Sequence, residues 1–286
     1  MKSGRAAIVG RPNSGKSTLI NALVGRKISI VTNRPQTTRK IIQGTYWDDR
    51  GQIIFLDTPG VFAKIKDPIG KKMAKLSKES LSGIDLVLYL VDRCRSRGEE
   101  ENRILGMVRK IDKPKILVIN KIDVKKPNQI HEYLFLKEEF DAIIEISALR
   151  KQHLKSLLTK IFELLPEGEA IFNQESSAVF PVIDLPPKEF LAEIIREKAF
   201  TSLRQELPYT LGVEVNRVEE KENIFEIEAT IFTDDDHHKS IIIGKSGAMI
   251  KEIGSLARKE MELITDKKVF LKLQVVTDRR WYQKLS

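Results

Sequence analysis

The stretch Gly10-Arg11-Pro12-Asn13-Ser14-Gly15-Lys16-Ser17 fits the phosphate-binding pattern G-x-x-x-x-G-K-[ST]. It follows an apolar run at residues 6–9 and opens a helical run at residues 18–24, the strand-to-helix context that such a loop requires. A tight turn before a helix N-terminus points successive backbone N–H groups at one spot, where they can hold phosphate oxygens. The octapeptide therefore predicts a phosphate loop, in which Lys16 reaches the outer phosphates and the Ser17 hydroxyl takes one position on Mg²⁺.

A second motif, Asp57-Thr58-Pro59-Gly60, follows the apolar residues 53–56 further along the chain. A carboxylate at the end of a strand can hold Mg²⁺ through a water molecule, and the Gly60 N–H can contact a γ-phosphate. We therefore expect Asp57 and Gly60 to lie beside the phosphate loop.

A third motif, Asn120-Lys121-Ile122-Asp123, follows the apolar run 116–119. One carboxylate can accept two hydrogen bonds from the N1–H and the exocyclic amine of guanine, whereas adenine offers neither donor in that arrangement. A site built around such a pair rejects the analogue that lacks it by roughly 10⁴ to 10⁵. Asp123 therefore predicts a preference for guanine nucleotides.

The apolar runs indicate the fold of this N-terminal part. Residues 41–47 and 53–56 flank a hairpin turn, and the continuous apolar runs 86–91 and 116–119 are typical of strands buried on both faces. A further segment at 142–146 leads into Ser147. Helix-length segments separate these runs, and an amphipathic helix at 154–165 ends at Pro166. We expect an α/β domain with a mostly parallel sheet and helices on both faces.

With these motifs in this order, residues 5–165 resemble a translation-factor-type small GTPase, with GTP as substrate and GDP as product. The resemblance implies that Thr38, which we choose over Thr37, coordinates Mg²⁺ when the triphosphate orders the loop at 26–40. It implies Mg²⁺ ligands at Ser17, Thr38 and Asp57, and catalytic roles for Lys16, Thr38, Gly60 and Asn13. The implied nucleotide-binding set comprises the three motifs quoted above together with Val61, Ser147, Ala148 and Leu149.

Val61 departs from the pattern of those relatives that carry a glutamine to orient the attacking water. Valine cannot form a hydrogen bond, so the resemblance is to GTPases with a hydrophobic residue there, some of which recruit K⁺ through the asparagine at position 13. Two interpretations of Asn13 stay open, a ligand for K⁺ and simple turn chemistry. We expect slow turnover, comparable to the roughly 10⁻⁴ to 10⁻² s⁻¹ of unassisted GTPases.

Length and composition indicate a soluble chain of two domains. The 286 residues include one cysteine, Cys94, which excludes a disulfide framework, and no apolar run approaches the length of a membrane helix. We therefore expect a cytoplasmic protein. The net charge of +9 is unevenly distributed: residues 1–180 carry 32 Lys and Arg against 21 Asp and Glu, and residues 237–286 carry 11 against 5. A polyanionic partner should therefore contact the last 50 residues or the N-terminal domain.

A breaker-rich stretch divides the chain into a GTPase domain at 1–166, a linker at 167–187 and a second domain at 188–286. The second domain shows a helix from about residue 191, alternating strands around 211–215 and 225–231, a helix at 250–264 and a strand at 269–275. We therefore expect the order α, β, β, α, β, with residues 241–243 forming an apolar turn and His237-His238 a loop or helix start without further metal ligands.

The sequence Ile243-Gly244-Lys245-Ser246-Gly247 carries a G-x-x-G loop before the last long helix. Two glycines let the backbone approach a nucleic-acid phosphate, and the helix N-terminus adds N–H donors. In this context the second domain resembles an α+β KH domain of the second type, which clamps single-stranded nucleotides. The implied RNA-binding residues are the five just quoted together with Ile250, Lys251 and Arg258.

The whole chain resembles the family of bacterial ribosome-assembly GTPases that join one GTPase domain to one KH domain. The resemblance implies binding to small-subunit ribosomal RNA near its 3′ end, a role in small ribosomal subunit assembly, and peripheral contact with the inner face of the membrane. We expect a monomer with no obligate protein partner. Two rival hypotheses stay open: a GTPase that supports RNA modification, and an RNA-binding module that GTP merely stabilises.

Overall fold

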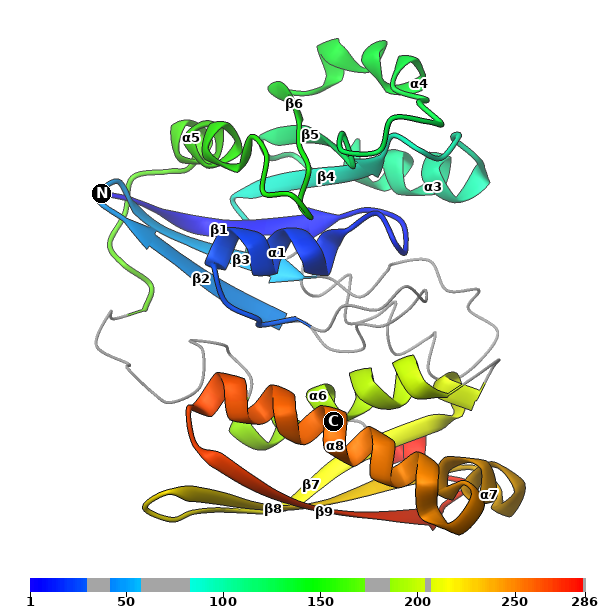
Figure 1. Ribbon diagram of the computed structural model, residues 1–286. Helices are drawn as coiled ribbons and strands as arrows, with labels where there is room; N and C mark the ends of the chain where they lie inside the picture. Colours follow the sequence, from blue (N-terminus) through cyan, green and yellow to red (C-terminus); the bar gives the residue numbers. More distant parts are fainter. Residues whose placement is uncertain (30–41, 58–82, 173–185, 204–206, 285–286) are drawn as a thin grey trace. The chain divides into compact units, whose positions relative to one another are not determined.

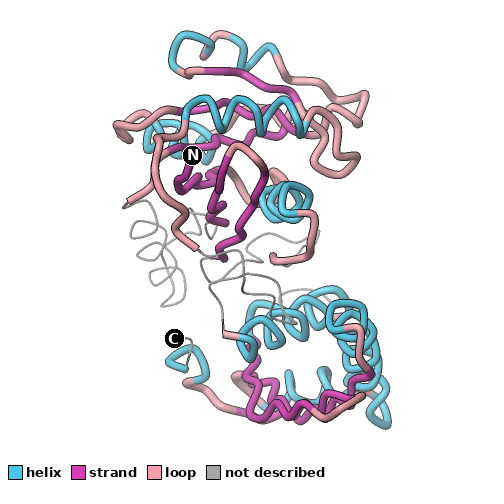
Figure 2. The backbone as a smooth tube through the Cα atoms, turned by 90° about the vertical axis from the view of Figure 1, so that its left-hand side faces the viewer, coloured by secondary structure: helices cyan, strands magenta, loops and turns pink. Residues whose placement is uncertain are grey.

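The computed structural model describes residues 1–29, 42–57, 83–172, 186–203 and 207–284. The chain forms two compact units, and among the described residues the first unit ends at Phe172 and the second begins at Pro186. No helix within these described ranges is both long enough and apolar enough to cross a bilayer. Both units are drawn in Figures 1 and 2.

The first unit is built around one sheet. Its elements are β1 (Lys2–Val9), α1 (Lys16–Val24), β2 (Ile42–Asp48), β3 (Gly51–Asp57), β4 (Leu86–Asp92), α3 (Glu99–Val108), β5 (Lys115–Asn120), α4 (His131–Leu134), η1 (Lys137–Glu139), β6 (Ala142–Glu145) and α5 (Leu154–Leu164). The strand order is β2-β3-β1-β4-β5-β6. Only β2 runs antiparallel to its neighbour β3, so the predicted hairpin and the predicted mostly parallel sheet are both confirmed.

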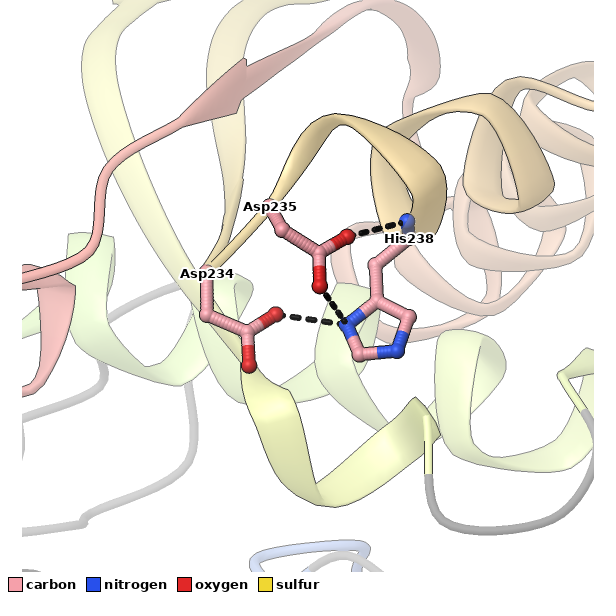
Figure 3. A group of neighbouring side chains, drawn as sticks. All are labelled: Asp234, Asp235 and His238. Carbon is pink, nitrogen blue, oxygen red and sulfur yellow. Dashed lines mark hydrogen bonds and ion pairs between the residues drawn. The ribbon is translucent and has the colours of Figure 1, made fainter.

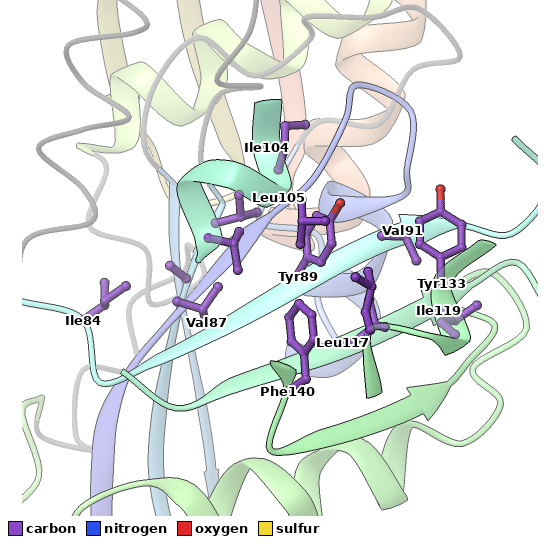
Figure 4. Packing of buried hydrophobic residues seen from close by; sticks show 14 of the residues in the cluster. Ile84, Val87, Tyr89, Val91, Ile104, Leu105, Leu117, Ile119, Tyr133 and Phe140 are labelled. Atoms are coloured by element: carbon purple, nitrogen blue, oxygen red, sulfur yellow. The ribbon is translucent and has the colours of Figure 1, made fainter. Parts of the chain in front are cut away.

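The sheet is buried on both faces, because its central strands carry runs of consecutive apolar residues, such as Leu86–Val91 of β4 and Ile116–Ile119 of β5. On one face the odd-numbered residues of β4, including Tyr89, pack against Ile104 and Leu105 of α3, as Figure 4 shows. On the other face Leu88 and Leu90 are equally inaccessible. The segment between β5 and β6, however, has the length of a helix and contains only the short α4 and η1 among its described elements.

The parallel strands deliver the predicted motifs to one edge. In register, Ile8 of β1 lies beside Asp57 of β3, and Asp92 of β4 lies beside Asn120 of β5. The phosphate loop, Asp57 and Asn120 therefore all emerge at the carboxyl edge of the sheet, where open α/β sheets bind their ligands.

Residues 167–172, which we assigned to the linker, lie against the first unit. The Gly168 N–H donates to the Met1 carbonyl oxygen at 3.0 Å. The buried Gln52 amide accepts from the Ile171 N–H at 2.7 Å and donates to the Phe172 carbonyl oxygen at 3.0 Å. The outer limits of the linker stay a prediction.

The second unit is a three-stranded sheet with its long helices on one face. Its elements are α6 (Pro187–Ser202), η2 (Leu207–Thr210), β7 (Leu211–Glu220), β8 (Ile224–Thr233), α7 (Asp236–Ile243), η3 (Lys245–Gly247), α8 (Ala248–Thr265), β9 (Lys268–Thr277) and η4 (Trp281–Lys284). The strand order is β7-β8-β9, antiparallel between β7 and β8 and parallel between β8 and β9. Both α6 and α8 lie against the same face (Figures 1 and 2).

The predicted order α, β, β, α, β was wrong by one helix, because α7 precedes α8 and the order is α, β, β, α, α, β. Residues 241–243 are the last turn of α7, not an apolar turn, and Gly244 ends that helix with its N–H on the Ser240 carbonyl oxygen. The helix has eight residues and a polar first half, so its sequence lacks the apolar period that marks a longer helix.

Candidate functional site

The phosphate loop has the backbone shape that its sequence predicts. Gly15 has φ 102° and Asn13 has φ 63°, so the chain turns through two left-handed residues before α1 begins at Lys16. A Cβ atom at Gly10 would lie 2.2 Å from the Leu90 carbonyl oxygen, which only glycine avoids. The loop is thereby held against β4 and presents the N-terminus of α1, where backbone N–H groups and the helix dipole favour anions.

The Lys16 amine lies inside this loop. Its Nζ donates to the carbonyl oxygens of Gly10 and Arg11, both at 2.9 Å. Burial lowers the pKa of the Lys16 ammonium, although the nearby carboxylates of Asp57, Glu100 and Glu101 act in the opposite direction. A buried ammonium group that is bonded to carbonyl oxygens is stabilised further when an anion enters the loop and pairs with its charge. The geometry of Lys16 therefore suits phosphate.

Arg11 contributes to the loop through its backbone rather than its side chain. Its guanidinium is buried and pairs with Glu101 of α3 at 2.5 Å, and it also donates to the Ser96 carbonyl oxygen at 3.2 Å. The hydroxyl groups of Tyr89 and Tyr133 both donate to the same Glu101 carboxylate. This buried network fixes the carbonyl oxygen of Arg11, which accepts from Lys16 and from the Ser14 N–H.

Asp57 is fully buried at the end of β3, where its Oδ2 accepts two hydroxyl hydrogen bonds. Ser17 donates at 2.8 Å and Ser29 at 2.6 Å. Because the Ser17 hydroxyl donates its hydrogen bond to Asp57, the lone pairs of the Ser17 oxygen can coordinate a cation. A hydroxyl oxygen beside a carboxylate is a hard donor set, which fits Mg²⁺. Sequence reasoning missed Ser29, because it belongs to no motif.

The base-side motif is bonded to the phosphate loop. Asn120 donates from Nδ2 to the Ser14 carbonyl oxygen at 2.9 Å and accepts at Oδ1 from the N–H groups of Lys121 and Ala148. The Lys121 amine donates to the Asn13 carbonyl oxygen at 2.9 Å and pairs with Asp92 at 2.6 Å. Asn120 and Lys121 thus connect the phosphate loop, the end of β4 at Asp92 and the loop at Ala148.

Asp123 is held by a hydroxyl group. Ser147 donates to its Oδ1 at 2.5 Å, and Ser147 in turn accepts from the Arg150 N–H at 3.0 Å. Ala148 is buried and bonded to Asn120, whereas the side chain of Leu149 is 70% exposed. The structure therefore brings Asn120, Lys121, Asp123, Ser147 and Ala148 together. Thr38, Thr58, Pro59, Gly60 and Val61 lie outside the described residues.

In the second unit, the G-x-x-G loop joins α7 to α8 through three left-handed residues. Gly244 has φ 74°, Ser246 φ 51° and Gly247 φ 78°. A Cβ at Gly244 would press on Met249, whereas a Cβ at Gly247 would meet nothing within 4 Å. Gly244 is therefore needed for packing, and Gly247 leaves open space in front of the N-terminus of α8.

A groove of about 370 Å³ lies between α8 and β9. Three of its lining residues, Ile250, Lys251 and Arg258, were predicted from the sequence, and β9 adds Phe270, Leu271 and Leu273. The Phe270 side chain is 58% exposed. Since β9 is an edge strand, the groove combines apolar walls, the edge of that strand and two cations. Phe270 was missed, because it lies among the exposed residues of β9 that alternate with the less exposed Val269, Leu271 and Leu273.

The prediction that His238 lacks neighbouring ligands was wrong. Figure 3 shows Nδ1 of its imidazole facing the carboxylates of both Asp234 and Asp235, and one possible ligand atom from each of the three residues lies within 4.8 Å of the others. Asp235 accepts from the His238 N–H at 2.7 Å, and Asp234 accepts at 2.6 Å from Nδ1 of the same residue. These are the bonds of a helix N-cap and of an ion pair, and we assign them that role.

Two family models match the chain. Residues 5–121 match the model described as a 50S ribosome-binding GTPase, and residues 206–281 match that of the KH domain. Among curated relatives, GTPase Era of Caldicellulosiruptor saccharolyticus is 43% identical over 98% of this chain and 93% of the relative. GTPase Era of Borreliella burgdorferi is 42% identical over 98% and 96%.

Two solved structures are similar over the full chain. An Aquifex aeolicus Era variant bound to GDP.AlF4- has a TM-score of 0.91 at 38% identity, and covers 100% of this chain and 97% of its own. An Era complex with MgGDPNP and nucleotides 1506–1542 of 16S ribosomal RNA has a TM-score of 0.92 at 38% identity, with coverage of 100% and 96%.

Proposed function

The chain belongs to the Era family of GTPases, and from this membership and its two sites we propose that it is a GTP-hydrolysing switch that binds small-subunit ribosomal RNA. In this proposal the first unit binds and hydrolyses GTP, the second unit holds the RNA, and the protein acts in small ribosomal subunit assembly. The observation that carries the proposal of nucleotide binding is the hydrogen bond from Asn120 to the phosphate loop. This bond connects the motif that reads the base to the loop that holds the phosphates.

At the nucleotide site each described residue has a distinct task. The N–H groups of residues 13–17 hold the phosphates, and the Lys16 amine exchanges its two carbonyl partners for phosphate oxygens. Ser17 and Asp57 would hold Mg²⁺, which neutralises charge on the phosphates when bound. Ser147 orients Asp123 toward the guanine edge. The catalytic roles of Thr38 and Gly60 stay part of this proposal.

The Asp123→Asn variant tests the base site. An amide offers the N1–H and the amine of guanine one acceptor and one donor instead of two acceptors, so GTP affinity should fall by at least 100-fold, within the discrimination known for such sites. Xanthosine triphosphate, which carries an oxygen where guanine has the amine, should bind the variant better than GTP does. Asp112→Asn, an exposed carboxylate outside the site, is the control. Retained GTP selectivity would refute the assignment.

A Lys16→Ala variant separates catalysis from mere stabilisation by nucleotide. Removal of the amine that faces the phosphates should abolish phosphate release from GTP. If the hydrolysis rate were unchanged, Lys16 would not be a catalytic residue.

For the RNA site, the α8–β9 groove has the features that single strands need. Exposed Phe270 can stack on a base, the edge of β9 offers backbone donors and acceptors, and Lys245, Lys251 and Arg258 can face phosphates. The RNA-bound Era structure resembles this chain over its whole length, which supports a target near the 3′ end of the small-subunit RNA. The family model that mentions the 50S subunit stops at residue 121 and does not include this groove.

Gly247→Asp tests the RNA proposal without filling a packed position. Aspartate tolerates left-handed backbone, and a Cβ at this residue meets nothing within 4 Å. The added carboxylate should repel an RNA phosphate and weaken binding of a 16S 3′-end oligonucleotide by at least tenfold, while GTP affinity stays unchanged. Gly98→Asp makes the same change at an open position of the first unit and should leave RNA affinity intact. Equal RNA affinity in both variants would refute the site.

Asn13 is our proposed K⁺ ligand. It is the first of the two left-handed residues of the phosphate loop, and its carbonyl oxygen accepts a hydrogen bond from the Lys121 amine. Hydrolysis should be faster in KCl than in NaCl, and Asn13→Gly, which keeps the backbone freedom, should remove that difference. Equal rates of the wild type in the two salts would refute the K⁺ role.

We further propose that the protein is a monomer in the cytoplasm that contacts the inner membrane face peripherally. Light scattering measures the first point, and co-sedimentation with anionic vesicles measures the second.

A further inference from the structure

Ser29, which belongs to none of the quoted motifs, contacts Asp57, and Asn21 holds the backbone of Ser29. Ser29 is 1% exposed, and its hydroxyl donates to Asp57 Oδ2 at 2.6 Å. Asn21 of α1 holds the backbone around Ser29 with three bonds: it accepts from the N–H groups of Ile28 and Ser29 at 2.8 and 2.9 Å, and it donates to the Ser29 carbonyl oxygen at 2.7 Å.

The Ile28 side chain adds a second anchor for this segment. It is buried, and its Cδ1 would lie 1.9 Å from a Cβ added at Gly44 of β2. The backbone at Ser29 is therefore held independently of its hydroxyl. Among the described residues, the Ser29 hydroxyl has one hydrogen-bond partner, which is Asp57.

That bond matters because the protein alone sets the orientation of the Asp57 carboxylate, which is 0% exposed. Ser17 donates to the same oxygen, and the Ser17 oxygen is also a proposed metal ligand. A Mg²⁺ ligand set requires near-ideal octahedral angles, so a small rotation of the carboxylate spoils it.

We infer that Ser29 is a positioning residue for the Mg²⁺ site, which it orders through Asp57, and that Asn21 places Ser29 for this task. The inference rests on the proposed function, which assigns Ser17 and Asp57 to Mg²⁺. Loss of a partner that orients a metal-binding carboxylate costs about 10–100-fold in metal affinity. Through its hydroxyl, Ser29 thereby connects the segment after α1 to the retention of the metal and of the nucleotide.

The experiment measures the release rate of a fluorescent GDP analogue from the full-length protein as a function of free Mg²⁺. In Ser29→Ala the Mg²⁺ concentration at the midpoint should rise about tenfold. The release rate in excess EDTA should stay within about twofold of wild type, because the hydroxyl acts only through the metal site. A merely structural role would change the metal-free rate as well.

Two further variants and a control complete the design. Asn21→Ala keeps the hydroxyl but frees its backbone, and it should shift the midpoint in the same direction. Ser3→Ala removes another buried serine hydroxyl of the same unit, one with no hydrogen-bond partner among the described residues, and should shift nothing. Thermal denaturation checks that each variant is folded. If Ser29→Ala does not fold, Asn21→Ala serves as the test.

The outcomes separate this inference from the proposed function. An Asp57→Asn variant should shift the midpoint more than Ser29→Ala does. If Asp57→Asn shifts it and neither Ser29→Ala nor Asn21→Ala does, the positioning role is overturned and the metal site stands. If Asp57→Asn leaves the midpoint unchanged, the metal assignment itself fails, and the role of Ser29 fails with it.

Discussion

Asn120 donates from its side-chain nitrogen to the carbonyl oxygen of Ser14 at 2.9 Å, across a sequence separation of 106 residues. This bond passes directly over Gly15, where a Cβ atom would lie 2.3 Å from the same nitrogen. The contact between phosphate loop and base motif thus depends on a glycine at this position, both for its φ of 102° and for the missing side chain.

Gly15→Ala should therefore be far more damaging than a change of backbone preference alone. We expect a loss of about 3 kcal/mol or more, the sum of left-handed strain and overpacking, together with loss of GDP binding. Gly25→Ala is the matched control: its φ is 77°, but a Cβ there meets nothing within 4 Å, so only about 1–2 kcal/mol of strain should appear. Calorimetry and GDP titration measure both, and equal losses would contradict the proposed clash.

The buried network on Glu101 predicts a pH-dependent contribution to stability. Burial and the Glu101 carboxylate raise the pKa of the Tyr89 and Tyr133 hydroxyls. An unfolded tyrosine ionises near pH 10, so the folded protein keeps these protons when the unfolded chain loses them. The resulting stabilisation is complete below about pH 10 and declines as the pH rises above it.

Tyr89→Phe removes one donor to Glu101 and should cost about 1–3 kcal/mol at pH 7. Because the wild type loses its tyrosine contribution above pH 10, the difference in melting temperature between wild type and variant should shrink between pH 9 and pH 11. The transition of the first unit is recognised by its shift with GDP. Tyr282→Phe in the second unit is the control, and a constant difference across this pH range would contradict the argument.

Phe270 should contribute to RNA binding but little to folding, because this residue lines the groove and is 58% exposed. Phe270→Ala should weaken RNA binding by about 1–3 kcal/mol, the usual value of one base stacked on an aromatic ring. Leu263→Ala on α8 is the control: its side chain is 85% exposed and does not line the groove, so RNA affinity should not change. Fluorescence anisotropy with a labelled oligonucleotide distinguishes the two.

The cap of α7 gives a local prediction. Asp235→Ala removes the acceptor of the His238 N–H and should destabilise the helix by about 1 kcal/mol, seen as about fivefold faster amide exchange in residues 236–243. Asp234→Ala removes a half-exposed ion pair with the same histidine and should cost less, about 0–1 kcal/mol. A larger effect for Asp234→Ala would contradict our assignment of Asp235 as the cap.

Sequence determined those features that depend on local pattern. The phosphate loop, the antiparallel hairpin before Asp57 and the buried parallel strands follow from periodicity and glycine spacing, and all three are present. The same local logic failed for α7, because eight residues with a polar first half show no helical period.

Tertiary structure alone decided which distant side chains meet. No spacing rule joins Ser29 to Asp57 or turns the Arg11 side chain toward Glu101. The first contact arises because the parallel strands bring their carboxyl ends to one edge of the sheet. The second arises because the first turn of α3, which carries Glu101, packs beside the phosphate loop. Patterns in the sequence report what each segment prefers, whereas packing decides which preferences face one another across the fold.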